Sequence, residues 1–424
     1  MFITNACIRG RQGTWNLQVK DGVFSSIQPS GTEDTPEDAV DAGGRLLCAP
    51  FVEGHIHLDF ANTAGKPRAN VSGTLFEAIE IWADRKKAGL NDSDEIQRNA
   101  MAAIRSAIQS AVSHGVGFLR THVDVTDPEM IALKAMLKVK DAVKTFCKIQ
   151  IVAFPQNGIL AFPSGQQLMD KAMQLGADIV GGIPHLEHTR EDGVASVQFV
   201  FDLAEKYHAG VDIHCDEIDD EQSRYLEVMA AETIKRGMQG RVTASHAVAM
   251  AYYNAGYMAK LSSKLRAAQL GFTICPNENL QLQGRGYNAP IPRGVAPVKF
   301  ISELGLSVGF GQDSIEDPWY PIGDGNPLRN LDTGLHVSHM LTAEYIDRCL
   351  DFVTINPAQN LGILPIYGIE IGKPANFIIL DAPSDRVVLQ RHSTVLLNVH
   401  EGRMIFKRQP EVTTWLTELP DGQT

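Results

Sequence analysis

Short apolar runs alternate with longer amphipathic stretches through the middle of the chain. Each run is rich in Val and Ile and has the length of a buried strand, and the stretch that follows it has the spacing of a helix. Eight such strand–helix units in about 300 residues predict an α/β fold of the (β/α)8 TIM-barrel type, although periodicity alone also allows an open doubly wound sheet. The eight runs are residues 46–52, 117–123, 148–154, 179–183, 210–214, 241–246, 271–275 and 306–310.

The two ends of the chain follow a different pattern, in which residue types alternate around tight turns. Residues 17–27 indicate a hairpin around Asp21-Gly22, a dipeptide that two-residue turns favour. Runs rich in β-forming residues return at 375–380 and twice within 393–406. Similar ends that enclose a different middle predict one small β-sandwich built from both termini. The expected domains are 1–48 with 366–424 for the β-sandwich, and 49–365 for the barrel.

The composition is that of an ordinary globular protein, with 44% hydrophobic and 21% charged residues among 424. The 38 basic and 50 acidic residues give a net charge of −12, and no run of Lys or Arg stands out. Such a chain is a poor match for a phosphate backbone, so we expect no nucleic-acid partner. A free nucleobase carries no phosphate and is not excluded.

The cysteines, the first residues and the lengths of the apolar runs bear on where in the cell the protein works. The six cysteines are scattered without a Cys-x-x-Cys pair, which argues against a disulfide framework or a structural zinc cluster. The first residues lack the basic and apolar regions of a secretory signal, and no apolar run approaches the roughly 20 residues that span a membrane. We therefore expect a cytoplasmic protein with no membrane partner.

Two histidines follow the first apolar run. His55 and His57 are two positions apart, so in an extended chain their side chains point the same way. Such a pair suits two imidazoles on one metal ion, but two structural histidines bonded to the backbone explain it equally well.

Further ionisable residues follow later runs. His214 ends the fifth run and Glu217 follows it, His246 ends the sixth, and Asp313 follows the eighth. A barrel brings the carboxyl ends of all its strands to one mouth, so these side chains are expected to meet His55 there. Buried His, Asp and Glu are costly without partners, so packing does not account for the group. A metal or acid–base site is the better interpretation.

This arrangement of histidines and one Asp resembles the amidohydrolase superfamily, and longer motifs are similar to the bacterial cytosine deaminases. The resemblance covers nearly the whole chain. It implies a (β/α)8 barrel with one divalent metal ion, a flanking β-sandwich, a small pyrimidine base as substrate, and a homo-oligomer. The motifs that carry it are residues 53–59, 120–125, 150–156, 212–224, 242–246 and 317–321.

The resemblance implies a single metal centre. The fourth run and its end, residues 178–185, contain no Lys of the kind that bridges two metals in other members of the superfamily. Three nitrogens and one carboxylate with an open position suit a hydrolytic Zn2+ or Fe2+, and the sequence does not choose between them. The implied metal ligands are His55, His57, His214 and Asp313.

The resemblance also implies three catalytic residues. Glu217 corresponds to the family's proton shuttle, which protonates the ring nitrogen beside the attacked carbon and then the leaving amine. His246 orients the attacking water, and Asp313 accepts its proton. A structural His246 bonded to Asp313 is the alternative.

Four residues are expected to bind the substrate. Gln156 carries a donor and an acceptor that pair with a cyclic lactam edge, and it resembles the family's base-recognition residue. Phe154 and Trp319 can supply flat walls, although either could belong to the core. Ser314 stands where the family usually has Asp, which leaves room beside C5 of a pyrimidine, although Ser314 could instead act only on the metal's surroundings.

Two other positions depart from the family pattern: Gln312 stands where His is usual, and Ala247 where Thr is usual. The expected reaction is hydrolytic deamination of cytosine-type bases, with 5-methylcytosine and 5-fluorocytosine accepted. The alternatives are hydrolysis of another heterocycle, such as isoguanine, a triazine or a creatinine-like ring, and an inactive barrel that serves as a scaffold. The scaffold needs lost metal ligands, and none is lost.

Overall fold

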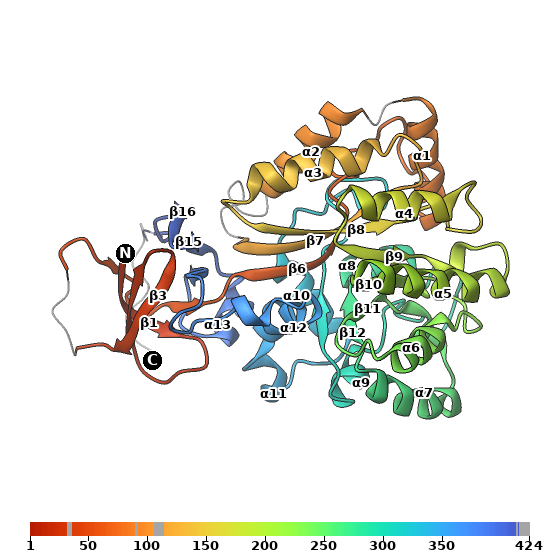
Figure 1. Cartoon of the computed structure of the whole chain (residues 1–424). Coiled ribbons are helices and arrows are strands. Elements are labelled where there is room, and N and C mark those ends of the chain that lie inside the picture. Colours follow the sequence, from red (N-terminus) through yellow and green to blue (C-terminus); the bar gives the residue numbers. More distant parts are fainter. Residues whose placement is uncertain (32–35, 90–91, 106–113, 413, 415–424) are drawn as a thin grey trace.

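The middle of the chain forms a closed barrel in the computed structural model, which describes residues 1–31, 36–89, 92–105, 114–412 and 414 (Figure 1). Eight parallel strands pair in chain order, and a bridge between Ile56 and Asp313 joins the last strand's end to the first. The (β/α)8 prediction is confirmed and the open sheet is excluded. The strands are β6 (Phe51–Ile56), β7 (Val116–Asp124), β8 (Lys148–Phe154), β9 (Ile179–Gly182), β10 (Gly210–Cys215), β11 (Val242–His246), β12 (Gly271–Ile274) and β13 (Val308–Phe310).

Helices follow the strands and cover the outside of the barrel (Figure 1). Side-chain caps start several of them: Thr189, for example, accepts from the Asp192 amide ahead of α5. The helices are α1 (Leu75–Lys87), α2 (Ser93–Arg105), α3 (Ile131–Val143), α4 (Gly165–Leu175), α5 (Arg190–Tyr207), α6 (Tyr225–Arg236), α7 (Ala255–Ala268), α8 (Pro276–Leu282), α9 (Val298–Glu303), α10 (Pro327–Val337), α11 (Ala343–Ile346), α12 (Ile355–Asn360) and α13 (Asp385–Arg391). The 3-10 turns are η2 (Pro184–Leu186), η3 (Val248–Tyr252), η4 (Cys349–Val353) and η5 (Leu364–Ile366).

The first apolar run is divided between two sheets. We expected one strand over 46–52, and this is wrong: β5 (Leu46–Cys48) joins the terminal sheet, whereas β6 begins at Phe51 in the barrel. Pro50 lies between them, and a proline has no N–H to continue a ladder. His55 therefore lies inside β6 rather than after it, and His57 follows the strand directly.

Strands from both termini form a second sheet beside the barrel (Figure 1). Neighbouring strands in this sheet are antiparallel, except that β1 pairs in parallel with β4 and with β5. Phe24 and Phe377, from opposite halves, approach with ring centroids 5.9 Å apart in a shared apolar core, so the sheet folds over on itself. Its other strands are β1 (Phe2–Ile8), β2 (Trp15–Lys20), β3 (Val23–Pro29), β4 (Val40–Asp41), β14 (Phe377–Leu380), β15 (Val395–His400) and β16 (Arg403–Lys407).

The predicted hairpin near the N-terminus is present. β2 and β3 pair across Asp21 and Gly22, whose φ angles are 51° and 81°. A type I′ turn requires positive φ at both central positions, which explains the Asp-Gly dipeptide.

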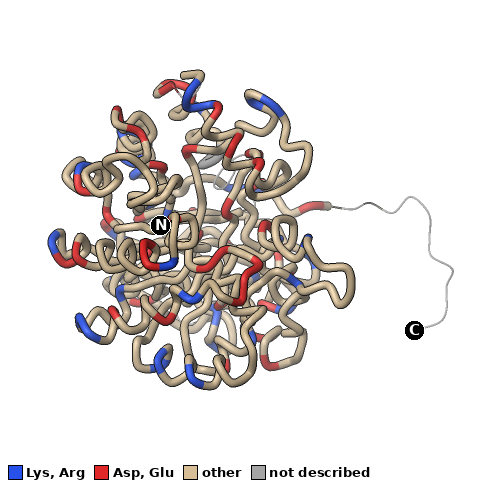
Figure 2. The backbone as a smooth tube through the Cα atoms, turned by 90° about the vertical axis from the view of Figure 1, so that its right-hand side faces the viewer, with Lys and Arg blue, Asp and Glu red and all other residues tan. Residues whose placement is uncertain are grey.

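Charge is mixed over the molecule. Figure 2 shows Lys and Arg positions interspersed with Asp and Glu positions along the described chain. No helix within the described ranges combines the length and the apolar character needed to span a membrane.

Candidate metal and active site

Four histidines and one aspartate meet where the barrel strands end. His57 Nε2 lies 3.1 Å from His214 Nε2 and 3.4 Å from Asp313 Oδ1. His55 Nε2 also lies 3.4 Å from Asp313 Oδ1. One donor atom from each of His55, His214, His246 and Asp313 lies within 4.8 Å of the others. The structure thus brings together the residues that the sequence marked as metal ligands, with His246 beside them.

This group has the donor set of a divalent metal site. His55 Nε2 and His246 Nε2 are buried and have no hydrogen-bond partner among the described residues, a costly state for polar atoms. Bonds of about 2.0–2.2 Å to one ion would space neighbouring donors roughly 3.0–3.5 Å apart. The distances from His57 to His214 and from Asp313 to His55 and His57 lie in this range. The residues present therefore fit a bound metal.

A chain of hydrogen bonds orients the His55 ring. Ser245 Oγ donates to Asp212 Oδ1 at 2.7 Å, and Arg120 donates to the other oxygen of Asp212 at 2.9 Å. The single proton of Ser245 is used in this way, so its oxygen accepts from His55 Nδ1 at 2.8 Å. His55 Nε2 is then the nitrogen with a free lone pair, turned toward Asp313.

Burial keeps the histidines of the group neutral. It lowers the pKa of His55, His57 and His246 to about 3 each, and it lowers the pKa of His214 well below its ordinary value. A neutral imidazole is the form that binds a metal.

Two residues of the group have left-handed backbone. His246 has a φ of 67° and Asp313 a φ of 68°, and such conformations cost energy in residues other than glycine. Asp313 is held in place by backbone pairing, because its amide donates to the His55 carbonyl at 2.8 Å. The surrounding structure therefore imposes these conformations where the side chains must converge.

Glu217 lies beside the group and opens onto the same pocket. Asn279 Nδ2 lies between Glu217 and His246, 3.4 Å from Glu217 Oε1 and 3.3 Å from His246 Nδ1. Burial, then the charge of Asp313, raises the pKa of Glu217 well above its ordinary range. A carboxyl group in this state keeps its proton to a higher pH than an ordinary carboxyl, which suits a group that donates and accepts protons.

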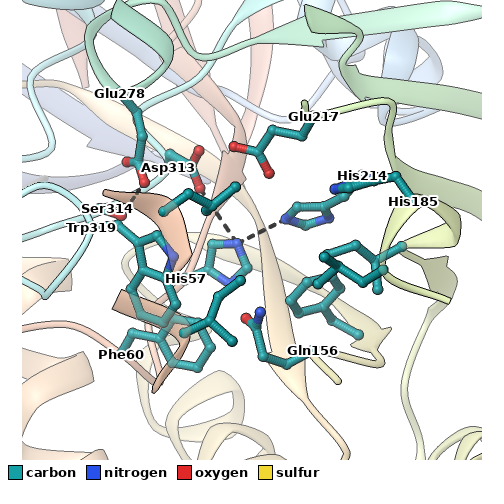
Figure 3. Close-up of a pocket in the computed structure, with 15 residues that line it drawn as sticks. His57, Phe60, Gln156, His185, His214, Glu217, Glu278, Asp313, Ser314 and Trp319 are labelled. Carbon is teal, nitrogen blue, oxygen red and sulfur yellow. Dashed lines mark hydrogen bonds and ion pairs between the residues drawn. The ribbon is translucent and has the colours of Figure 1, made fainter. Parts of the chain in front are cut away.

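A small pocket with a cavity volume of about 30 Å³ lies in front of the group (Figure 3). The ligand candidates His55 and His246 lie behind the lining. The lining residues are His57, Phe60, Leu75, Ile79, Phe154, Gln156, Ile183, His185, Leu186, His214, Glu217, Glu278, Asp313, Ser314 and Trp319.

Aromatic rings form the pocket walls. Phe60 is stacked between His57 and Trp319, with ring centroids 4.9 Å from each. Phe154 stacks on His214 at 4.1 Å, so it supports a metal-ligand candidate as well as lining the pocket. Both aromatic residues expected from the sequence, Phe154 and Trp319, thus lie at the pocket, and Phe60 joins them.

Two polar lining residues were not predicted from the sequence. His185 lies in η2, just after β9. Glu278 lies on α8, three residues beyond Cys275, the same spacing that separates Glu217 from His214. That repeated spacing after a strand end was a usable signal.

The two residues that flank Asp313 have different surroundings. Ser314 lines the pocket, and its hydroxyl donates to Glu278 Oε1 at 3.0 Å. Gln312 donates to the Ser314 carbonyl at 3.0 Å and accepts from Asn330 of α10 at 3.1 Å. Gln312 therefore supports the backbone of Ser314.

Residues 38–406 match the amidohydrolase family, and the chain belongs to it. The fold and the group of histidines with Asp313 are those of a metal-dependent hydrolase of carbon–nitrogen bonds.

The chain is similar over its length to crystal structures of 5-methylcytosine deaminase from Klebsiella pneumoniae. With the structure liganded with 5-fluorocytosine it shares 46% sequence identity, covering 98% of this chain and 99% of that chain, at a TM-score of 0.95. The structure liganded with phosphonocytosine gives 46% identity and a TM-score of 0.94, covering 98% and 100%. N-isopropylammelide isopropyl amidohydrolase of Pseudomonas sp. strain ADP is 27% identical over 416 residues, 96% of this chain and 97% of that protein.

Proposed function

We propose that the chain catalyses the metal-dependent hydrolytic deamination of cytosine-type bases, converting them to uracil-type bases and ammonia. The observation that carries this proposal is the pocket itself. A carboxyl group whose pKa is raised by burial (Glu217), a set of metal donors and a lactam-matching amide (Gln156) all face one space with aromatic walls. The likeness to a deaminase liganded with cytosine analogues supports it.

The metal in this proposal is one Zn2+ or Fe2+ per chain. His55, His57, His214 and Asp313 would hold it, and the position of His246 allows it to contact either the ion or the attacking water. When bound, such an ion lowers the pKa of water and polarises it for attack. The remaining steps belong to the side chains of the chain.

Glu217 moves the protons. In its protonated form it donates to N3, the ring nitrogen beside the attacked carbon C4. Water adds its oxygen to C4, and Glu217 and Asp313 take the protons that water gives up. The C4–N bond then breaks, and Glu217 returns a proton so that the group leaves as ammonia. Asp313 passes its proton to Glu217, which restores the starting state. Asn279 holds Glu217 and His246 in one orientation during these transfers.

Pocket residues orient the ring. Gln156 pairs with the N–H and C=O edge of the base, and Trp319 and Phe154 cover its apolar surface. With N3 toward Glu217, C5 lies on the other side of C4, where Ser314 lines the pocket. The small Ser314 leaves space for a C5 substituent, so the proposal includes 5-methylcytosine and 5-fluorocytosine as substrates.

Ammonia release by the metal-loaded protein tests this function. Cytosine and 5-methylcytosine should release ammonia, and isoguanine, a triazine and creatinine should do so much more slowly. If one of these other heterocycles releases ammonia faster than cytosine and 5-methylcytosine, that heterocycle replaces the cytosine-type bases as the assigned substrate. Absence of release from every base, with metal bound, would refute the deaminase proposal in favour of a scaffold.

The proposal also covers the setting of the enzyme. We propose a cytoplasmic homo-oligomer. Light scattering on the purified chain and fractionation of cells that express it test these two statements separately.

A further inference from the structure

The pocket wall opposite Glu217 carries a second buried carboxyl group, on Glu278. Its side chain is 2% exposed and comes from α8, and Figure 3 shows Glu278 and Glu217 on either side of Asp313. Glu278 Oε1 accepts from Ser314, whereas Oε2 has no hydrogen-bond partner among the residues described. The deamination steps above use Glu217 and leave Glu278 without a role.

A buried, unpartnered carboxyl oxygen at a pocket is costly unless a ligand satisfies it. The pattern that this chain resembles has a carboxylate at position 314, beside the metal Asp. Here position 314 holds a hydroxyl, and a carboxyl from α8 hydrogen-bonds to that hydroxyl. The polar character of this wall is therefore retained, while the space next to the ring is opened.

The orientation of the base places a definite atom at this wall. If N3 faces Glu217 and C4 faces the metal donors, the next ring carbon, C5, faces Ser314 and Glu278. A C5 methyl group would fill the space but would leave Glu278 Oε2 unpartnered. A substituent that ends in a hydroxyl would fill the same space and pair with Glu278, because an O–H both donates and accepts.

We propose that Ser314 and Glu278 form a polar subsite for C5-hydroxylated cytosines, with 5-(hydroxymethyl)cytosine as the smallest example. This inference rests on the proposed deaminase function and narrows its substrate class. A site built to hydrogen-bond a substrate hydroxyl discriminates against analogues without one, because its own polar group is then left unpaired.

The test compares kcat/KM for cytosine, 5-methylcytosine and 5-(hydroxymethyl)cytosine in the metal-loaded parent, Glu278→Gln and Glu278→Leu. We expect the parent to use the hydroxymethyl base at least as well as the methyl base. Glu278→Leu should lower the hydroxymethyl-to-methyl ratio about tenfold or more. Glu278→Gln, which keeps a donor and an acceptor, should hold the ratio within a few-fold of the parent.

Three outcomes would overturn the subsite. The parent could reject the hydroxymethyl base by more than tenfold relative to 5-methylcytosine, a result that needs no variant to fold. Glu278→Leu could lower kcat/KM equally for all three substrates, which would assign Glu278 to the amino group that they share. Glu278→Gln could lose the ratio as fully as Glu278→Leu. If cytosine and 5-methylcytosine release ammonia in these runs, only the subsite fails; if no base does, the proposed function fails.

Discussion

His57 and Asp313 are joined twice, once through their backbones and once through their side chains. The His57 amide donates to the Asp313 carbonyl at 2.8 Å, and His57 Nε2 lies 3.4 Å from Asp313 Oδ1. The backbone contact closes the barrel between the ends of β6 and β13. Closure of the fold and assembly of the candidate metal site therefore depend on the same pair of residues.

The first prediction concerns metal binding. The purified chain should contain about one divalent ion, and His57→Ala should lose metal and activity together because an inward-facing nitrogen is removed. His336→Ala is the matched control, since this exposed histidine on α10 bonds to Asp332 away from the pocket. Elemental analysis and ammonia release measure both effects. Full activity in metal-free protein would contradict the hydrolase mechanism.

The second prediction separates proton transfer from metal binding. Glu217→Gln should keep its metal and lose about 10²–10⁴-fold in kcat, because the amide preserves the shape but cannot carry the proton. Metal content, the kcat of the variant and its thermal unfolding distinguish a lost proton carrier from a lost fold. A variant within a few-fold of the parent would show that another group moves the protons.

The third prediction concerns the space beside C5. Ser314→Asp should lower kcat/KM for 5-methylcytosine relative to cytosine by about 10–200-fold, the cost of a lost methyl-sized contact. Ser314→Ala keeps the space and should keep the parent's ratio of kcat/KM for 5-methylcytosine to that for cytosine. Kinetics with both bases in the three proteins measure this ratio. Equal rejection of 5-methylcytosine by the parent and by Ser314→Asp would show that Ser314 does not determine this ratio.

The fourth prediction concerns the attachment of α1, which supplies part of the pocket lining. Lys86 Nζ lies 2.7 Å from Asp124 Oδ2 at the end of β7, and Trp82 donates to the same oxygen at 2.8 Å. Burial acts to raise the pKa of Asp124, but the charge of Lys86 and these hydrogen bonds outweigh it and lower that pKa. Lys86→Met should therefore destabilise the protein by about 3 kcal/mol at neutral pH.

The pH dependence of this effect has a definite sign. A lowered folded pKa contributes stability above the unfolded value of about 3.9, and that stability is lost as pH falls through the folded pKa. The gap in unfolding free energy between parent and Lys86→Met should thus be larger at pH 7.5 than at pH 3, which lies below the unfolded pKa. Denaturant unfolding at both pH values measures it, with Lys87→Met, an exposed neighbour, as control. A gap independent of pH would rule out Asp124 as its source.

The barrel and its donors followed from local patterns in the sequence. Alternating apolar runs and amphipathic stretches predict parallel strands with crossover helices, and a barrel gathers the ends of such strands at one mouth. His214, His246 and Asp313 could therefore be grouped although they are far apart in the chain. The metal-donor candidates could be found from the sequence because each lies at or beside a strand end.

Tertiary structure decided what local pattern does not encode. Pro50 divides the first run between two sheets, because register and sheet membership depend on pairing partners elsewhere in the chain. Glu278 reaches Ser314 because α8 packs on α10, which in turn packs on β13, and Gln312 bonds to Asn330 of α10 through the same long-range packing. The sequence by itself determined that the histidines of the metal group, Glu217 and Asp313 meet at the barrel mouth. Which of them face the pocket, and which support it from behind, was decided by the folded chain.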